Sequence, residues 1–86
     1  MPTICRFYGL LIQMYFDDHN PPHFHVIYGD HKAVIGINDF GVLEGDLPPR
    51  ALGLVTEWAR INKDALLEDW DRAIRMEALF PIKPLE

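Results

Sequence analysis

The sequence predicts an α+β fold, in which an antiparallel meander sheet of four to five strands is followed by two C-terminal helices packed on one face. Apolar and polar residues alternate through much of residues 3–46, which is the pattern of half-buried strands. Apolar residues then recur at helical spacing between Ala51 and Ile74. Prolines and glycines lie at the breaks in both patterns, where turns are expected.

The length of 86 residues and the apolar share of 49% predict a single domain over residues 1–86. Residues 1–46 are expected to form the sheet, residues 47–77 the helical pair, and residues 78–86 an irregular apolar tail. A chain this short buries only about 60–65% of its unfolded surface, so modest stability is expected.

Turn signals divide the first half of the chain into strands. The first strand is expected over Ile4–Tyr8, and Gly9 marks a tight turn or bulge before the second. A third strand follows the bend at Asp18–Pro22 and covers residues 23–28. Residues 32–37 and a short strand at residues 42–44 complete the predicted meander.

The pairing of the second and third strands is predicted from the requirement that apolar residues share one face. A hairpin with Asp17 opposite His23 pairs Phe16 with Phe24, Met14 with Val26, and Ile12 with Tyr28. The same register places Tyr15 beside His25 on the other face of the sheet.

The next hairpin is expected at Gly29-Asp30-His31, with Asp30-His31 as a two-residue loop. This loop places Gly36 opposite His25 and leaves open space there. Lys32 then lines the face that carries the histidines, a face expected to be partly open to water.

Two helices are predicted after residue 46. Leu47-Pro48-Pro49 starts the first, because proline suits a first helical turn, and Asn62 ends it and caps the second. The residues expected to face inward are Ala51, Leu54, Val55, Trp58, Ile61, Leu66, Leu67, Trp70, Ala73 and Ile74. Those expected to face outward are Glu68, Asp69, Asp71, Arg72 and Arg75. The apolar stretch Leu79–Ile82 must then pack on this chain or on another.

Composition narrows the class of protein. The net charge of −5 repels phosphate backbones at long range, so nucleic-acid binding requires a local basic patch, a metal ion or a basic partner. The single cysteine, Cys5, cannot form an internal disulfide and fits a reducing compartment. The N-terminus does not resemble a signal peptide, and no apolar run approaches the roughly 20 residues of a membrane helix. We therefore expect a cytoplasmic protein that does not interact with membranes.

A candidate site lies in residues 17–25, which hold three of the four histidines. His23 and His25 are two residues apart on a predicted strand, so their rings point the same way, about 6.5–7 Å apart. The third ligand of a metal site would come from His19, Asp17 or Asp18. Such a set leaves a coordination position open, and Zn, Mn or Fe would suit it.

Two other interpretations of the same residues stay open. Without a metal, His23 and His25 can act as general base and general acid, with Tyr15 and Lys32 in support, which suits cleavage of RNA through its own 2′-hydroxyl. Alternatively, the segment is only a stiff turn in which Asp17 or Asp18 accepts hydrogen bonds from backbone amides.

Several strings resemble a small bacterial domain family of unknown function. They are Arg6-Phe7-Tyr8-Gly9, Met14-Tyr15-Phe16, Asp17-Asp18-His19-Asn20-Pro21-Pro22-His23-Phe24-His25, Val42-Leu43-Glu44-Gly45-Asp46-Leu47-Pro48 and Leu66-Leu67-Glu68-Asp69-Trp70. The resemblance covers nearly the whole chain. It implies a toxin component of a type II toxin–antitoxin pair, masked by a small antitoxin-like protein from an adjacent gene. It implies no catalytic assignment.

Two functions are therefore expected as alternatives. One is a small ribonuclease-like toxin that acts through His23 and His25. The other is a non-enzymatic binding module that docks its partner through the open sheet face, an edge strand or the Leu79–Ile82 tail, with a homodimer also open.

Overall fold

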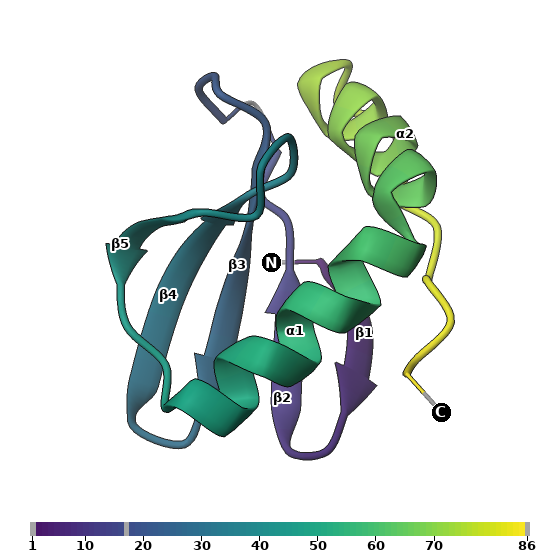
Figure 1. The fold of residues 1–86 in the computed structure, drawn as a ribbon. Coiled ribbons are helices and arrows are strands. Elements are labelled where there is room, and N and C mark those ends of the chain that lie inside the picture. Colours follow the sequence, from purple (N-terminus) through teal and green to yellow (C-terminus); the bar gives the residue numbers. More distant parts are fainter. Residues whose placement is uncertain (1, 17, 86) are drawn as a thin grey trace.

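The computed structural model describes residues 2–16 and 18–85 and shows the predicted α+β architecture (Figure 1). One antiparallel sheet holds its strands in sequence order: β1 (Thr3–Phe7), β2 (Leu10–Gln13), β3 (His23–Tyr28), β4 (His31–Gly36) and β5 (Val42–Gly45). Helix α1 (Pro49–Ile61) crosses one face of this sheet (Figure 1). Helix α2 (Lys63–Ile74) continues beyond α1 toward the end of the sheet at which β3 begins.

The core lies between α1 and the apolar face of the sheet. Trp58 of α1 is fully buried and meets Phe24 edge-on, with ring centroids 5.9 Å apart, and Phe7 at 5.5 Å. The inward residues of the central strands, Ile12, Val26 and Ile35, are also fully buried. Burial of each such aliphatic side chain stabilises the fold by about 1.5–3 kcal/mol. The predicted division of the sheet into an apolar and a histidine-bearing face is confirmed.

The predicted register of the β2–β3 hairpin is wrong by two residues. Ile12 pairs with Val26 rather than with Tyr28, and Gln13, not Tyr15, lies opposite His25. Phe16 is 39% exposed instead of joining the apolar face. A two-residue shift returns every side chain to its predicted face, so the apolar pattern is satisfied equally by both registers. The proposed partner of His23, Asp17, lies outside the described residues.

The second hairpin is shifted in the same way. Gly29 and Asp30 form its turn and Tyr28 pairs with His31, so Gly36 lies opposite His23 rather than His25. The φ of Gly29 is +58°, which suits a glycine in a tight hairpin turn. Side-chain faces are again conserved, and Lys32 remains on the predicted face.

Both helices follow the predicted boundaries, with differences at their ends. Pro49 occupies the first turn of α1, as predicted. The side chain of Asn62 donates to the carbonyl of Trp58 at 2.9 Å, so it caps the end of α1 rather than the start of α2. Ile61 and Ile74 were expected inside but are 69% and 41% exposed. Each lies in the last turn of its helix, where the chain leaves the core.

Asp69 was expected on the outer face of α2, and this prediction is wrong because the residue is fully buried. Its Oδ1 accepts hydrogen bonds from Nη1 of Arg72 at 2.8 Å and from the amide of Phe80 at 2.9 Å. The buried carboxylate therefore ties α2 to the C-terminal tail.

The tail packs on this chain. The amide of Ile82, which is 8% exposed, donates to the carbonyl of Ile4 in β1 at 2.7 Å. Nε1 of Trp58 donates to the carbonyl of Lys83 at 2.9 Å. Residues 79–85 thus run beside β1 (Figure 1). Among the described residues, no helix has the length and apolar character needed to cross a membrane.

Candidate functional site

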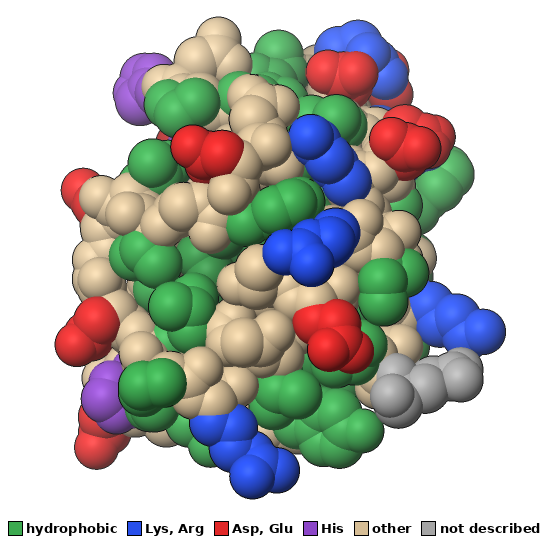
Figure 2. Space-filling model, in the orientation of Figure 1, with side chains coloured by type: hydrophobic (Ala, Val, Ile, Leu, Met, Phe, Trp, Pro, Cys, Tyr) green, Lys and Arg blue, Asp and Glu red, His purple; other side chains and the backbone are tan. Residues whose placement is uncertain are grey.

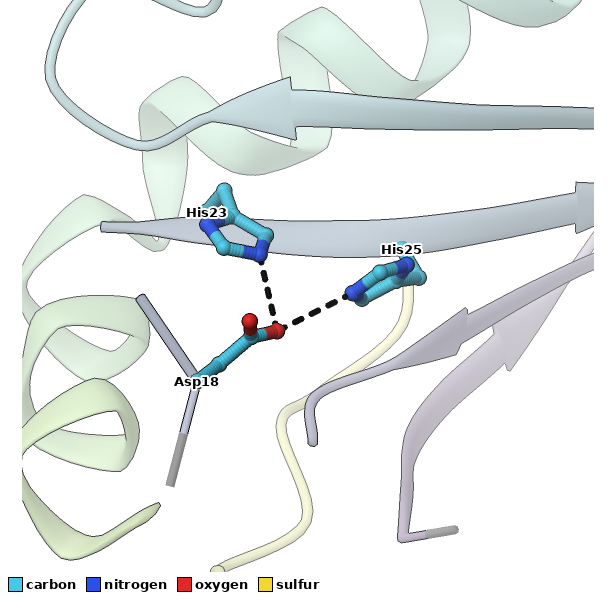
Figure 3. A group of neighbouring side chains, drawn as sticks. All are labelled: Asp18, His23 and His25. Atoms are coloured by element: carbon cyan, nitrogen blue, oxygen red, sulfur yellow. Dashed lines mark hydrogen bonds and ion pairs between the residues drawn. The ribbon is translucent and has the colours of Figure 1, made fainter. Parts of the chain in front are cut away.

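The carboxylate of Asp18 lies between the imidazoles of His23 and His25 (Figure 3). Its Oδ2 is 2.9 Å from Nε2 of His23 and 3.3 Å from Nε2 of His25. The three ligand-type atoms lie within 4.8 Å of one another. The structure therefore brings both predicted histidines and one predicted carboxylate to a single point.

Local structure explains this convergence. His23 and His25 are alternate residues of β3, so both leave the same face of the strand. The segment between β2 and β3 turns back over that face and delivers Asp18 to the rings. His19 is exposed and belongs to no such cluster of described residues, while Asp17 lies outside the described part of the chain.

Backbone groups orient two of the three side chains. Nδ1 of His23 lies 2.7 Å from the carbonyl of Pro21, which can only accept a hydrogen bond, so this nitrogen carries a proton. Oδ1 of Asp18 accepts from the amide of His19 at 2.9 Å, which leaves Oδ2 directed at the histidines. Both orienting groups come from the bend itself.

Aromatic rings hold the imidazoles from outside. The ring of Tyr15 stacks on His25, with centroids 3.9 Å apart and planes 9° from parallel. Trp70 of α2 packs against His23 at 5.1 Å, and His23 is only 8% exposed. The histidine face is thus partly open to water, as predicted, and His23 is the member that Trp70 covers. Nothing in the sequence indicated the contact of Trp70, because it joins segments 47 residues apart, from 23 to 70.

The electrostatics of the site favour the ionised carboxylate. Burial by itself raises the pKa of Asp18, but the bond from the His19 amide, the bonds from His25 and His23 and the charge of His23 outweigh it. Their combined effect lowers the pKa of Asp18 below its usual range. The site thus presents a negative charge beside two ring nitrogens.

A cavity of about 310 Å³ adjoins His25 on the outer side of the sheet. Tyr15, His25, Lys32 and Glu44 supply its polar lining. Lys32 pairs with Ile27, so it lies one pleat further along the sheet from His25. The lining of this cavity therefore includes Tyr15 and Lys32, the two residues predicted to support the histidines.

Two kinds of chemistry suit this arrangement. The set of two imidazoles and one carboxylate is a known ligand type for Zn, Mn or Fe. For acid–base work, both Nε2 atoms already face Asp18 and Nδ1 of His23 is bonded to Pro21. Nδ1 of His25 bonds to no described residue and is the ring nitrogen best placed to meet a substrate.

Comparison with known proteins adds a family. The sequence model of the family described as "Domain of unknown function (DUF4160)" matches residues 9–71, which include the whole candidate site. No curated protein matches the chain. No solved structure matches it either.

Proposed function

The chain belongs to the DUF4160 family, a domain of unknown function, and on that premise we propose that it is the toxin-type component of a bacterial two-protein module and cleaves RNA at the Asp18–His23–His25 centre. The observation that carries this proposal is the convergence of two imidazoles on one carboxylate. Most of the core lies on the other face of the sheet, although Trp70 of the core packs against His23. Titratable groups gathered beside a cavity are typical of catalytic sites.

RNA is the proposed substrate because it carries its own nucleophile. In such cleavage the 2′-oxygen bonds to phosphorus, the bond from phosphorus to the 5′-oxygen breaks, and a proton passes from the 2′-hydroxyl to the 5′-oxygen. The products are a 2′,3′-cyclic phosphate and a free 5′-hydroxyl. Side chains of the Asp18–His23–His25 centre accept this proton from the 2′-hydroxyl and deliver it to the 5′-oxygen. The ammonium of Lys32 in the cavity lining offsets the phosphate charge.

Charge limits the way in which RNA binds. The chain carries a net charge of −5. On the face that carries α1, basic, acidic and hydrophobic side chains are interspersed among the described residues (Figure 2). That face does not present a continuous basic surface, so the proposal assigns RNA contact to the cavity of Tyr15, His25 and Lys32, with short rather than extensive phosphate contact.

Growth of bacteria that express the chain tests the proposal. We expect expression alone to arrest growth and cleave cellular RNA, and co-expression with the neighbouring gene to restore growth. His25→Ala should abolish the effect, whereas His31→Ala, which removes an exposed histidine outside the centre, should not. Equal toxicity of His25→Ala and the parent chain, or a harmless parent chain, would refute it.

A non-enzymatic docking role is the second candidate, and one observation favours it. All four residues of β5 are exposed, including Val42 at 40% and Leu43 at 46%, and β5 is an edge strand. An extended segment of a partner can pair with such an edge. Two exposed acidic residues, Glu44 in β5 and Asp46 just after it, favour a basic segment. The Leu79–Ile82 tail, predicted as a docking element, has Ile82 buried on this chain.

Size-exclusion chromatography with and without the neighbouring gene product tests docking. A stable complex that Leu43→Lys abolishes supports pairing at β5. A homodimer sensitive to the same substitution would assign the edge to a second copy instead. A monomer that ignores the neighbour removes the docking role.

A further inference from the structure

We propose that Asp18, His23 and His25 bind one divalent transition-metal ion through Oδ2, Nε2 and Nε2, with Zn²⁺, Mn²⁺ and Fe²⁺ as the suitable ions. The inference concerns the centre on which the proposed function rests and names the cofactor of that centre. It does not depend on the identity of the substrate.

Two of the three separations between the ligand atoms are close to those around such an ion. Ligands at about 2.0–2.2 Å from a tetrahedral Zn²⁺ lie about 3.3 Å from one another. Oδ2 of Asp18 and Nε2 of His25 are 3.3 Å apart. Oδ2 and Nε2 of His23 are 2.9 Å apart, and all three ligand atoms lie within 4.8 Å of one another, so small adjustments of the three side chains are required to enclose the ion.

The hydrogen bond of His23 to Pro21 sets the tautomer that a metal needs. With Nδ1 protonated toward the carbonyl of Pro21 at 2.7 Å, a neutral ring carries a bare lone pair on Nε2. That lone pair faces Oδ2 of Asp18 at 2.9 Å, so either a proton or a metal ion must lie between the two acceptor atoms. Metal-bound histidines characteristically donate their other ring nitrogen to a backbone carbonyl or a carboxylate.

Without a metal, a proton must lie between Nε2 of His23 and Oδ2 of Asp18, carried by one or the other side chain. The ring of His23 is 8% exposed and packed against Trp70. A divalent ion satisfies the two imidazoles and the carboxylate together, without a buried imidazolium. Three protein ligands also leave a coordination position for water or for a phosphate oxygen.

The orientation of all three ligands is set by groups that are not ligands. The His19 amide fixes Asp18, the Pro21 carbonyl fixes His23, and the Tyr15 ring holds His25. A site whose ligands are oriented before the ion arrives loses less conformational freedom on binding. This support distinguishes the cluster from an accidental meeting of surface side chains.

Calorimetric titration with Zn²⁺ of the full chain, first freed of metal with a chelator, tests the inference. We expect one ion per chain, with affinity weakened about 100-fold or more in Asp18→Asn and in His25→Ala. His31→Ala, matched as a histidine outside the centre, should bind like the parent. Absence of binding, or equal affinity in all four proteins, would overturn the inference.

Nitrogen NMR of the histidine rings provides a readout that does not depend on variants. Zn²⁺ should shift the Nε2 signals of His23 and His25 and leave His31 unchanged, and circular dichroism verifies that each variant is folded. Unshifted Nε2 signals would refute the site even where a variant fails to fold. Zn²⁺ binding without toxicity would support the metal site and refute the proposed function. RNA cleavage by a chain that binds no metal would support the proposed function and refute the metal site.

Discussion

The imidazole of His25 lies flat against the phenol ring of Tyr15, with centroids 3.9 Å apart and planes within 9°. Strand pairing does not produce this contact, since the residue opposite His25 is Gln13. Tyr15 follows the end of β2, where the chain leaves the sheet and curves over the histidine face. The stack therefore belongs to the bend that also delivers Asp18.

Replacement of Tyr15 tests whether this stack positions His25. Tyr15→Leu removes the flat ring surface, and we expect the affinity for Zn²⁺ to fall about 10-fold, the lower end of the effect of losing an orienting neighbour. Tyr15→Phe retains the ring and should bind like the parent. Calorimetric titration measures both, and equal affinities for Leu and Phe would show that the stack does not orient His25.

Asp69 is predicted to contribute substantially to stability. Asp69→Ala removes the acceptor of Arg72 and of the Phe80 amide, so the free energy of unfolding should fall by about 2–4 kcal/mol. Glu68→Ala is the matched control, because Glu68 is the exposed neighbour on the same helix and should change stability by less than about 0.5 kcal/mol. Urea denaturation compares the two, and similar losses would contradict the anchoring role.

Two glycines should respond to alanine with opposite signs. Gly45 has φ +73°, and a Cβ there would overlap the carbonyl oxygen of Lys32, so Gly45→Ala should destabilise the fold by about 1–3 kcal/mol. Gly53 lies in α1 with open space around it, so Gly53→Ala should stabilise by about 0.5–1 kcal/mol. Thermal unfolding reports both. An unchanged stability of Gly45→Ala would mean that the end of β5 does not require a glycine at this position.

Cys5 is predicted to make stability depend on alkaline pH. Burial raises the pKa of its thiol, outweighing hydrogen bonds involving Arg6 and Trp58. The folded state therefore holds the proton more tightly than the unfolded state, so the contribution is complete below the pKa of an ordinary thiol, about 8.5, and is lost as pH rises above it. The stability difference between the parent and Cys5→Ala should shrink in that range. A constant difference across alkaline pH would contradict this.

The sequence predicts the faces of the sheet better than its register. Ile12, Val26 and Ile35 are buried as expected, yet the predicted registers of the β2–β3 and β3–β4 hairpins each differ from the structure by two residues. Alternation has a period of two and cannot distinguish such registers. The turn residues decide between them. The turn at Gly9 was predicted from the glycine, but Tyr8, expected to end the first strand, lies in that turn as well.

In the candidate site, too, the shared face of two side chains was predictable from the sequence, whereas contacts between distant segments were not. The spacing of His23 and His25 was sufficient to predict that their rings share a face. The choice of Asp18 depends on the path of the bend, which spacing alone does not determine. Trp70 against His23 and the burial of Asp69 depend on where α2 and the tail lie, which are contacts between distant segments. Helical periodicity assigned Asp69 to the outside because the tail that covers it has no periodic signal.

The bond between the Ile82 amide and the Ile4 carbonyl affects how copies of the chain can associate. Because the tail bonds to the outer side of β1, β5 at the opposite side of the sheet is, among the described residues, the edge open to strand addition. Growth of a continuous intermolecular sheet requires two free sides on every copy. Self-pairing through β5 would therefore stop at two chains, which protects a protein with an exposed apolar strand from forming fibres.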